Sequence, residues 1–88
     1  MMNERQQWII EGEFARSLRL SLGLSINEMA TMMGVAWSTV KRFEDGQKVR
    51  RRRFLVTAYH LALDSEDQRR EIIRLQGELQ YFLSRQAS

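Results

Sequence analysis

The amino-acid sequence predicts an all-α fold, in which five helices form one compact domain over residues 1–88. Apolar residues recur at steps of three and four, no segment shows the alternation of a strand, and proline is absent. A chain of 88 residues can bury one core but rarely two, and 43% hydrophobic with 28% charged residues is an ordinary globular balance. Because cysteine is absent, stability must come from packing, and a reducing compartment suits the chain.

The first predicted helix ends at Gly23, a residue type that commonly follows a helix end. Four of its apolar residues stand four apart, at Ile10, Phe14, Leu18 and Leu22. This spacing places them on one face, which we expect to pack on the core. Gly12 lies inside the same segment and is expected to kink or weaken the helix.

A short helix is predicted to begin at Ser25. The Ser25 hydroxyl can accept the Glu28 backbone N–H while the Glu28 carboxylate accepts that of Ser25, which is a capping box. An apolar stripe follows, formed by Met29, Ala30 and Met33. Gly34 then stands where the end of a helix favours a left-handed residue, so the helix has about two turns.

A second short helix is predicted from Trp37 to Asp45, after a turn at residues 35–36. Val40 and Phe43 stand three apart on it and should face inwards, and Gly46 ends it. Two short helices joined tightly over residues 24–46 form the supersecondary unit that can place its second helix in the major groove of DNA.

Beyond this unit, a basic loop is predicted at residues 47–53, then a fourth helix to about Asp64 and a fifth from Ser65, over about 66–85. The fifth helix carries an a/d seam of under two heptads, at Ile72, Leu75, Leu79 and Phe82. The seam is a candidate dimer interface, flanked by Ile73 and Leu83. The alternative is that these residues pack inside the monomer as a fifth core helix.

Positive charge is concentrated in one segment. The net charge is only +3, yet residues 41–53 hold seven basic and two acidic residues. Such a cluster is expected where a chain meets a polyanion, although a solvated loop or a patch for anionic lipid has the same composition.

Taken in order, Gly23-Leu24-Ser25, Glu28-Met29-Ala30, Gly34-Val35, Ser38-Thr39-Val40, Phe43-Glu44 and Gly46 resemble the lambda-repressor-like (Xre/Cro-type) helix-turn-helix family. The resemblance covers roughly residues 14–63. It implies a DNA-binding domain whose second motif helix contacts base edges, through Trp37, Ser38, Lys41 and Arg42. Trp37 departs from the family pattern, and a core or dimer-face position is the alternative for it.

The resemblance also implies roles outside the base contacts. Arg19 and Glu44 match positions that form an internal ion pair between two helices. A family glutamine that touches phosphate is replaced by Ile26, so basic residues are expected to supply backbone contacts instead. The phosphate contacts we expect are Ser25, Thr39, Lys48, Arg50, Arg51, Arg52 and Arg53.

The function expected from these residues is a sequence-specific transcriptional regulator that binds double-stranded DNA, of a phage or bacterial repressor type, acting as a homodimer on a palindromic operator. The alternative is an antitoxin or adaptor whose C-terminal helix binds a partner protein. No enzyme, cofactor or metal motif is found, and His60 is expected to be a plain helix residue. No run is apolar enough for a membrane span or a secretory signal, so a cytoplasmic location is expected.

Overall fold

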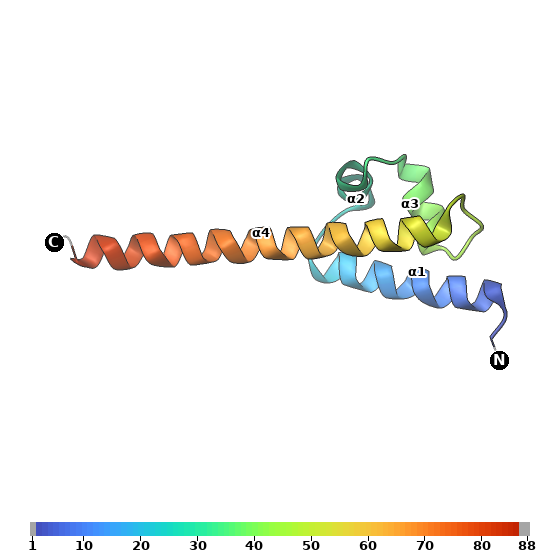
Figure 1. Cartoon of the computed structure of the whole chain (residues 1–88), viewed down its shortest axis with the longest axis horizontal. Helices are drawn as coiled ribbons and strands as arrows, with labels where there is room; N and C mark the ends of the chain where they lie inside the picture. The colour runs from blue at the N-terminus through green and yellow to red at the C-terminus, as the bar shows by residue number, and fades with distance from the viewer. Residues whose placement is uncertain (1, 87–88) are drawn as a thin grey trace.

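The computed structural model describes residues 2–86, and these form four helices and no strand (Figure 1). The helices are α1 (Glu4–Ser21), α2 (Ile26–Met33), α3 (Trp37–Glu44) and α4 (Arg52–Gln86). α1 lies along the first half of α4, α2 and α3 pack on the same core, and the second half of α4 projects away from them. We call residues 3–65 the head and residues 66–86 the stalk. The all-α prediction is confirmed, whereas the count of five helices was wrong.

The break predicted near Asp64 is absent because α4 continues through it. Ser65 caps no new helix, and neither glycine nor proline interrupts residues 52–76. Acidic and basic side chains pair at helical spacing instead: Glu66 with Arg69 and Arg70, and Arg74 with both Glu71 and Glu78. Each such pair contributes roughly 0.2–0.5 kcal/mol to a helix, so the acids that suggested a start reinforce the helix interior.

Beyond its first turn, where Glu66 and Arg69 line pockets beside α2, the stalk packs on no other element among the described residues. Ile72, Leu75, Leu79 and Phe82 are each at least half exposed. The alternative that they form a fifth core helix within the monomer is therefore contradicted. No helix over residues 2–86 has the combined length and apolarity that crossing a bilayer requires.

The core of the head takes side chains from all four helices. Its fully buried large residues are Met29, Val40, Phe43 and Tyr59, and the rings of Phe43 and Tyr59 lie 5.4 Å apart between centroids. The inward positions predicted for Met29, Ala30, Val40 and Phe43 are confirmed, and Met33 is partly buried against the same core.

α1 buries a different face from the one predicted. Of the four residues on the predicted face, Leu18 and Leu22 are partly buried against the core, whereas Ile10 and Phe14 are more than half exposed. The buried residues of α1 are Gly12, Ala15 and Arg19. The start of α1 was also missed: the Asn3 side chain accepts the Gln6 backbone N–H at 2.8 Å and the Gln6 side chain returns the bond, as in a capping box.

Gly12 allows α1 to touch the end of α3. A Cβ built on Gly12 would lie 2.4 Å from the Glu44 carbonyl oxygen and 2.6 Å from that of Phe43. Both neighbours are backbone atoms, which cannot rotate away. The helix continues through Gly12 without ending, so the glycine serves close packing and the expected weakening is not its role.

The Gly12→Ala variant should therefore lower the free energy of unfolding by about 1–3 kcal/mol or more, because the methyl group overpacks the contact of α1 with α3. Urea denaturation followed by circular dichroism measures this. Gly77→Ala is the matched control, since a Cβ at Gly77 meets nothing within 4 Å, and it should leave the midpoint unchanged or raise it. Equal stability of the two variants would contradict the packing role of Gly12.

Candidate nucleic-acid interface

Both ends of α2 are capped by the residues that the sequence predicted. Ser25 Oγ accepts the Glu28 N–H at 3.0 Å, and the Glu28 carboxylate accepts the Ser25 N–H at 3.0 Å. At the other end, Gly34 adopts the left-handed conformation with φ of 70°, and the Val35 N–H reaches back to the Ala30 carbonyl at 3.0 Å. Only residues 34–36 separate the two helices.

α3 has an apolar inner face and a polar outer face. Val40, Phe43 and Glu44 are buried. The four residues predicted to meet base edges are all exposed: Trp37, Ser38, Lys41 and Arg42. Helical geometry spreads them over an arc of roughly 140°. Trp37 is 50% exposed, so the core position considered for it is excluded.

The N-terminus of α3 has no side-chain cap. Its N-cap residue is Ala36, whose methyl group cannot accept a hydrogen bond. The first amides of a helix point outwards and carry the positive end of the helix dipole, which favours an anion such as a phosphate oxygen. Thr39, predicted to contact phosphate, lies in this first turn and is partly buried.

Lys41 is held by an ion pair on the outer face. Its Nζ lies 3.0 Å from Asp45 Oδ1, and both side chains are substantially exposed. Exposed pairs of this kind contribute little stability, about 0–1 kcal/mol. The pair can therefore open readily, and Lys41 is available to an acceptor on another molecule.

Beneath the outer face, a buried ion pair joins α1 to α3. Arg19 Nε and Nη2 donate to the two oxygens of Glu44 at 2.8 and 3.0 Å, and Arg19 Nη1 donates to the Leu24 carbonyl at 2.7 Å. Tyr59 of α4 donates its hydroxyl to Glu44 Oε2 at 2.7 Å. The predicted pair of Arg19 and Glu44 is confirmed, and it extends to a third helix.

Arg19 and Tyr59 keep their protons over the physiological range. The hydrogen-bonded Glu44 carboxylate raises the pKa of Arg19, although burial opposes that shift. Burial raises the pKa of Tyr59, and the hydrogen bond to Glu44 acts in the same direction. Arg19 therefore remains a cation and Tyr59 a hydrogen-bond donor.

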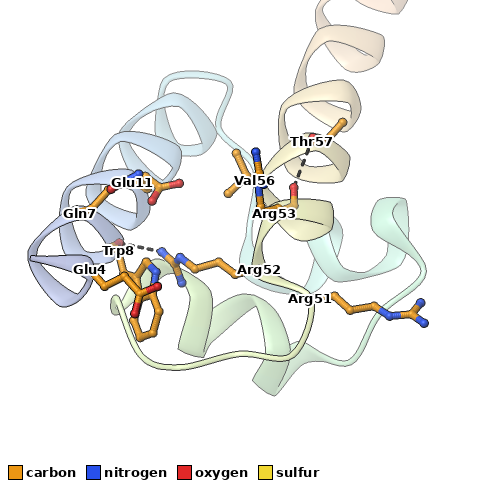
Figure 2. A pocket seen from close by; sticks show the side chains of 9 residues that line it. All are labelled: Glu4, Gln7, Trp8, Glu11, Arg51, Arg52, Arg53, Val56 and Thr57. Carbon is orange, nitrogen blue, oxygen red and sulfur yellow. Dashed lines mark hydrogen bonds between the residues drawn. The ribbon is translucent and has the colours of Figure 1, made fainter.

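The expectation that Arg52 contacts phosphate was wrong, because its side chain is buried in the head. Its Nη2 donates to the Trp8 carbonyl at 2.7 Å (Figure 2). Its Nη1 donates to the Gln47 carbonyl at 3.3 Å. The guanidinium also lies 4.6 Å from the centroid of the Phe43 ring, within cation–π range. Arg52 thus ties α1 to the α3–α4 connection, and burial lowers its pKa.

The remaining basic residues of this segment are at the surface. Lys48, Arg50, Arg51 and Arg53 are exposed. In Figure 2 the Arg51 side chain points away from α1 and from Arg52. Arg51 is the one non-glycine residue among residues 2–86 with positive φ, at 55°. The basic loop predicted at residues 47–53 ends earlier than expected, because α4 already begins at Arg52.

No family model, curated protein or solved structure matches this chain. The interface is therefore defined by its own geometry. Among residues 2–86 no cluster of three histidine, cysteine or acidic side chains is placed to hold a metal ion. His60 is a helix residue of α4 that packs between two aromatic rings. Its ring centroid lies 6.0 Å from that of Phe14 and 6.2 Å from that of Tyr59.

Two positioning residues were missed from the sequence. The sequence indicates Tyr59 only as an apolar residue of the fourth helix, and nothing in it signals a partner for the hydroxyl. Arg52 stands among three other arginines, yet it lies three residues before Leu55 and seven before Tyr59, which is the spacing of the buried face. That spacing could have distinguished it from the exposed arginines.

Replacing Glu44 by Gln should lower the free energy of unfolding by roughly 3–5 kcal/mol, because it leaves the buried Arg19 cation without its counter-charge. Chemical denaturation measures the loss. The matched control is Glu71→Gln, which breaks an exposed pair with Arg74 and should cost less than about 1 kcal/mol. If the two substitutions destabilised the protein equally, the buried pair would not be holding α3 on α1.

Proposed function

We propose that this chain is a sequence-specific transcriptional regulator that binds double-stranded DNA by placing α3 in the major groove. The observation that carries the proposal is the division of α3: Val40, Phe43 and Glu44 anchor it in the head, and the opposite side presents four exposed side chains. A firmly held helix with an exposed polar face at the end of a tight helix-turn-helix is the arrangement that reads base edges. The proposed mode of action is that of a phage or bacterial repressor, which occludes an operator.

Within this proposal the outer residues divide between base and backbone contacts. Arg42 presents the forked guanidinium that pairs with guanine O6 and N7. Ser38 can donate to or accept from several bases. Half-exposed Trp37 has an apolar surface suited to a thymine methyl group or to the sugar-phosphate edge. Lys41 supplies a charge once it leaves Asp45.

Phosphate contacts would come from the positive surface around α3. The exposed residues proposed for them are Lys48, Arg50, Arg51 and Arg53. Ser25 caps the start of α2 and Thr39 lies in the first turn of α3. The Ser25 hydroxyl keeps its own proton to donate because it acts as an acceptor in the cap. The uncapped amides of α3 add to the attraction for a phosphate.

The stalk supports a homodimer as the active form. One head offers a small contact area, and two heads on a two-fold axis match a palindromic operator. The predicted interface residues Ile72, Leu75, Leu79 and Phe82 are exposed and open to such pairing. The same exposure favours a second candidate function, an antitoxin or adaptor whose stalk binds a different protein.

Selection of bound duplexes from a random DNA pool tests the proposed function, and a palindromic consensus is the expected result. Arg42→Ala should weaken binding to that consensus by about 1–3 kcal/mol and relax the preference at one position of each half-site. Arg53→Ala is the matched control: it should weaken all duplexes alike and reduce the slope of log affinity against log salt by about 0.9 for each phosphate that is no longer neutralised.

Recovery of no consensus would contradict sequence-specific binding. If Arg42→Ala changed nothing while charge reversal at Arg50, Arg51 and Arg53 abolished binding, the arginines alone would be acting, as in a non-specific polyanion binder. The Arg42→Ala and Arg53→Ala variants should keep the helix content of the parent protein, because both arginines are exposed.

A further inference from the structure

An outward row of side chains runs along the whole of α4, well beyond the seam recognised in the stalk. When the heptad spacing of the stalk seam is continued towards the N-terminus, the d positions are Phe54, Leu61, Gln68, Leu75 and Phe82. The a positions are Ala58, Ser65, Ile72, Leu79 and Gln86. We call these ten residues the α4 stripe. It spans more than four heptads, the length at which a heptad pattern becomes typical of a coiled coil.

The stripe faces away from the core of the head. The buried residues of α4 are Arg52, Leu55, Tyr59 and Leu63, which lie on the opposite side of the helix. Phe54 is 66% exposed and Leu61 is 62% exposed, although both belong to the head. The stripe carries large exposed apolar side chains on both sides of the polar residues Ser65 and Gln68. Exposed apolar side chains aligned along one helix face indicate an interaction surface. The core of the head therefore does not account for them.

We infer that α4 pairs with α4 of a second copy of this chain, parallel and in register, along the entire stripe. Ile72 at an a position followed by Leu75 at a d position is the combination that favours two parallel strands. A two-fold axis along the stripe sets each side chain against its own counterpart, so one stripe supplies both sides of the interface.

The parallel direction follows from which residues each arrangement covers. Antiparallel pairing centred between Leu75 and Leu79 would cover the stalk but leave Phe54 and Leu61 in water. It would also set Glu78 against Glu78 of the partner subunit, at the flanking g positions. These like charges oppose pairing, although the same register sets Glu71 beside Arg85 of the partner subunit twice.

Parallel pairing covers Phe54 and Leu61 together with the stalk. At the flanking positions it sets Asp64 beside Arg69 of the partner subunit, twice by symmetry. Glu71 then faces Gln76 of the partner subunit. Glu78 faces Leu83 of the partner subunit, so no like charges meet at the flanking positions. The apolar pattern of α4, which the parallel arrangement covers in full, therefore decides the direction of pairing, and the charges of the parallel arrangement are compatible with it.

The direction of pairing determines where the two α3 helices lie. The molecule is 63 Å long but only 28 and 18 Å across, and the head occupies one end of α4 (Figure 1). Parallel pairing puts both heads at the same end, on opposite sides of the axis, whereas antiparallel pairing puts them at opposite ends. If α3 reads DNA as proposed above, operator half-sites should then be centred one helical turn apart, about 34 Å.

Single-cysteine variants test the pairing without DNA, because the chain has no cysteine of its own. Under mild oxidation Gln68→Cys and Leu61→Cys should each form a disulfide-linked dimer, since d positions of a parallel pair face each other. Antiparallel pairing would separate two residues at position 68 by about 27 Å, at 1.5 Å of rise per residue, far beyond disulfide reach. Ser84→Cys is the matched control, because Ser84 lies on the far side of the stalk and should stay a monomer on a denaturing gel.

Cross-linking through Leu75→Cys but not Gln68→Cys would overturn the parallel direction, and failure of Leu61→Cys alone would overturn the extension into the head. Sedimentation of the parent chain as a monomer at micromolar concentration would overturn self-pairing. Leu79→Glu should convert the dimer to a monomer, while Gln80→Glu, on the exposed side of the stalk, should leave it intact. A chain that cross-links as expected yet selects no DNA consensus would refute the proposed function and leave the pairing standing.

Discussion

The contact of Arg19 with Glu44 fixes the orientation of α3, and the rest of the head is arranged around it. Two hydrogen bonds in fork geometry leave the carboxylate little freedom to rotate, and Tyr59 holds the same oxygen from a third helix. Buried ion pairs add little net stability over apolar packing of the same size. Their effect is directional: a pair that must be fully hydrogen-bonded admits one relative position of its helices, so the outer face of α3 points one way.

Close approach of α1 is the condition for this arrangement. Gly12 lets the helix backbone rest against the last carbonyls of α3, and Arg19 stands two turns later on the same face. Arg52 closes the other side by donating to carbonyls of α1 and of the α3–α4 connection. Arg52 and Gly12 thus meet backbone carbonyls at the C-terminal end of α3. The helix is only eight residues long, and these contacts compensate for the packing that so short an element lacks.

α4 serves the head and the stalk through opposite faces of one helix. Leu55, Tyr59 and Leu63 complete the core of the head, while all residues of the α4 stripe except the partly buried Ala58 are exposed. Nothing in residues 66–86 is buried within the chain apart from the partial cover of Glu66, so ion pairs and intrinsic helix preference support the stalk in the monomer. A helical segment with so little burial is weakly stable in isolation, and pairing of the stripes would add the missing burial.

The sequence by itself determined the all-helical class, the caps at Ser25 and Gly34, the inward Val40 and Phe43, and the exposed residues of α3, because these depend on neighbours within one turn of the chain. The resemblance supplied the pair of Arg19 with Glu44. Only the tertiary structure decided the inner face of α1, the burial of Arg52, the third partner Tyr59 and the unbroken α4. Each of these depends on which elements meet, and on groups far apart in sequence. Local patterns assign a residue to a helix, but the partner that approaches that helix determines which of its faces is buried.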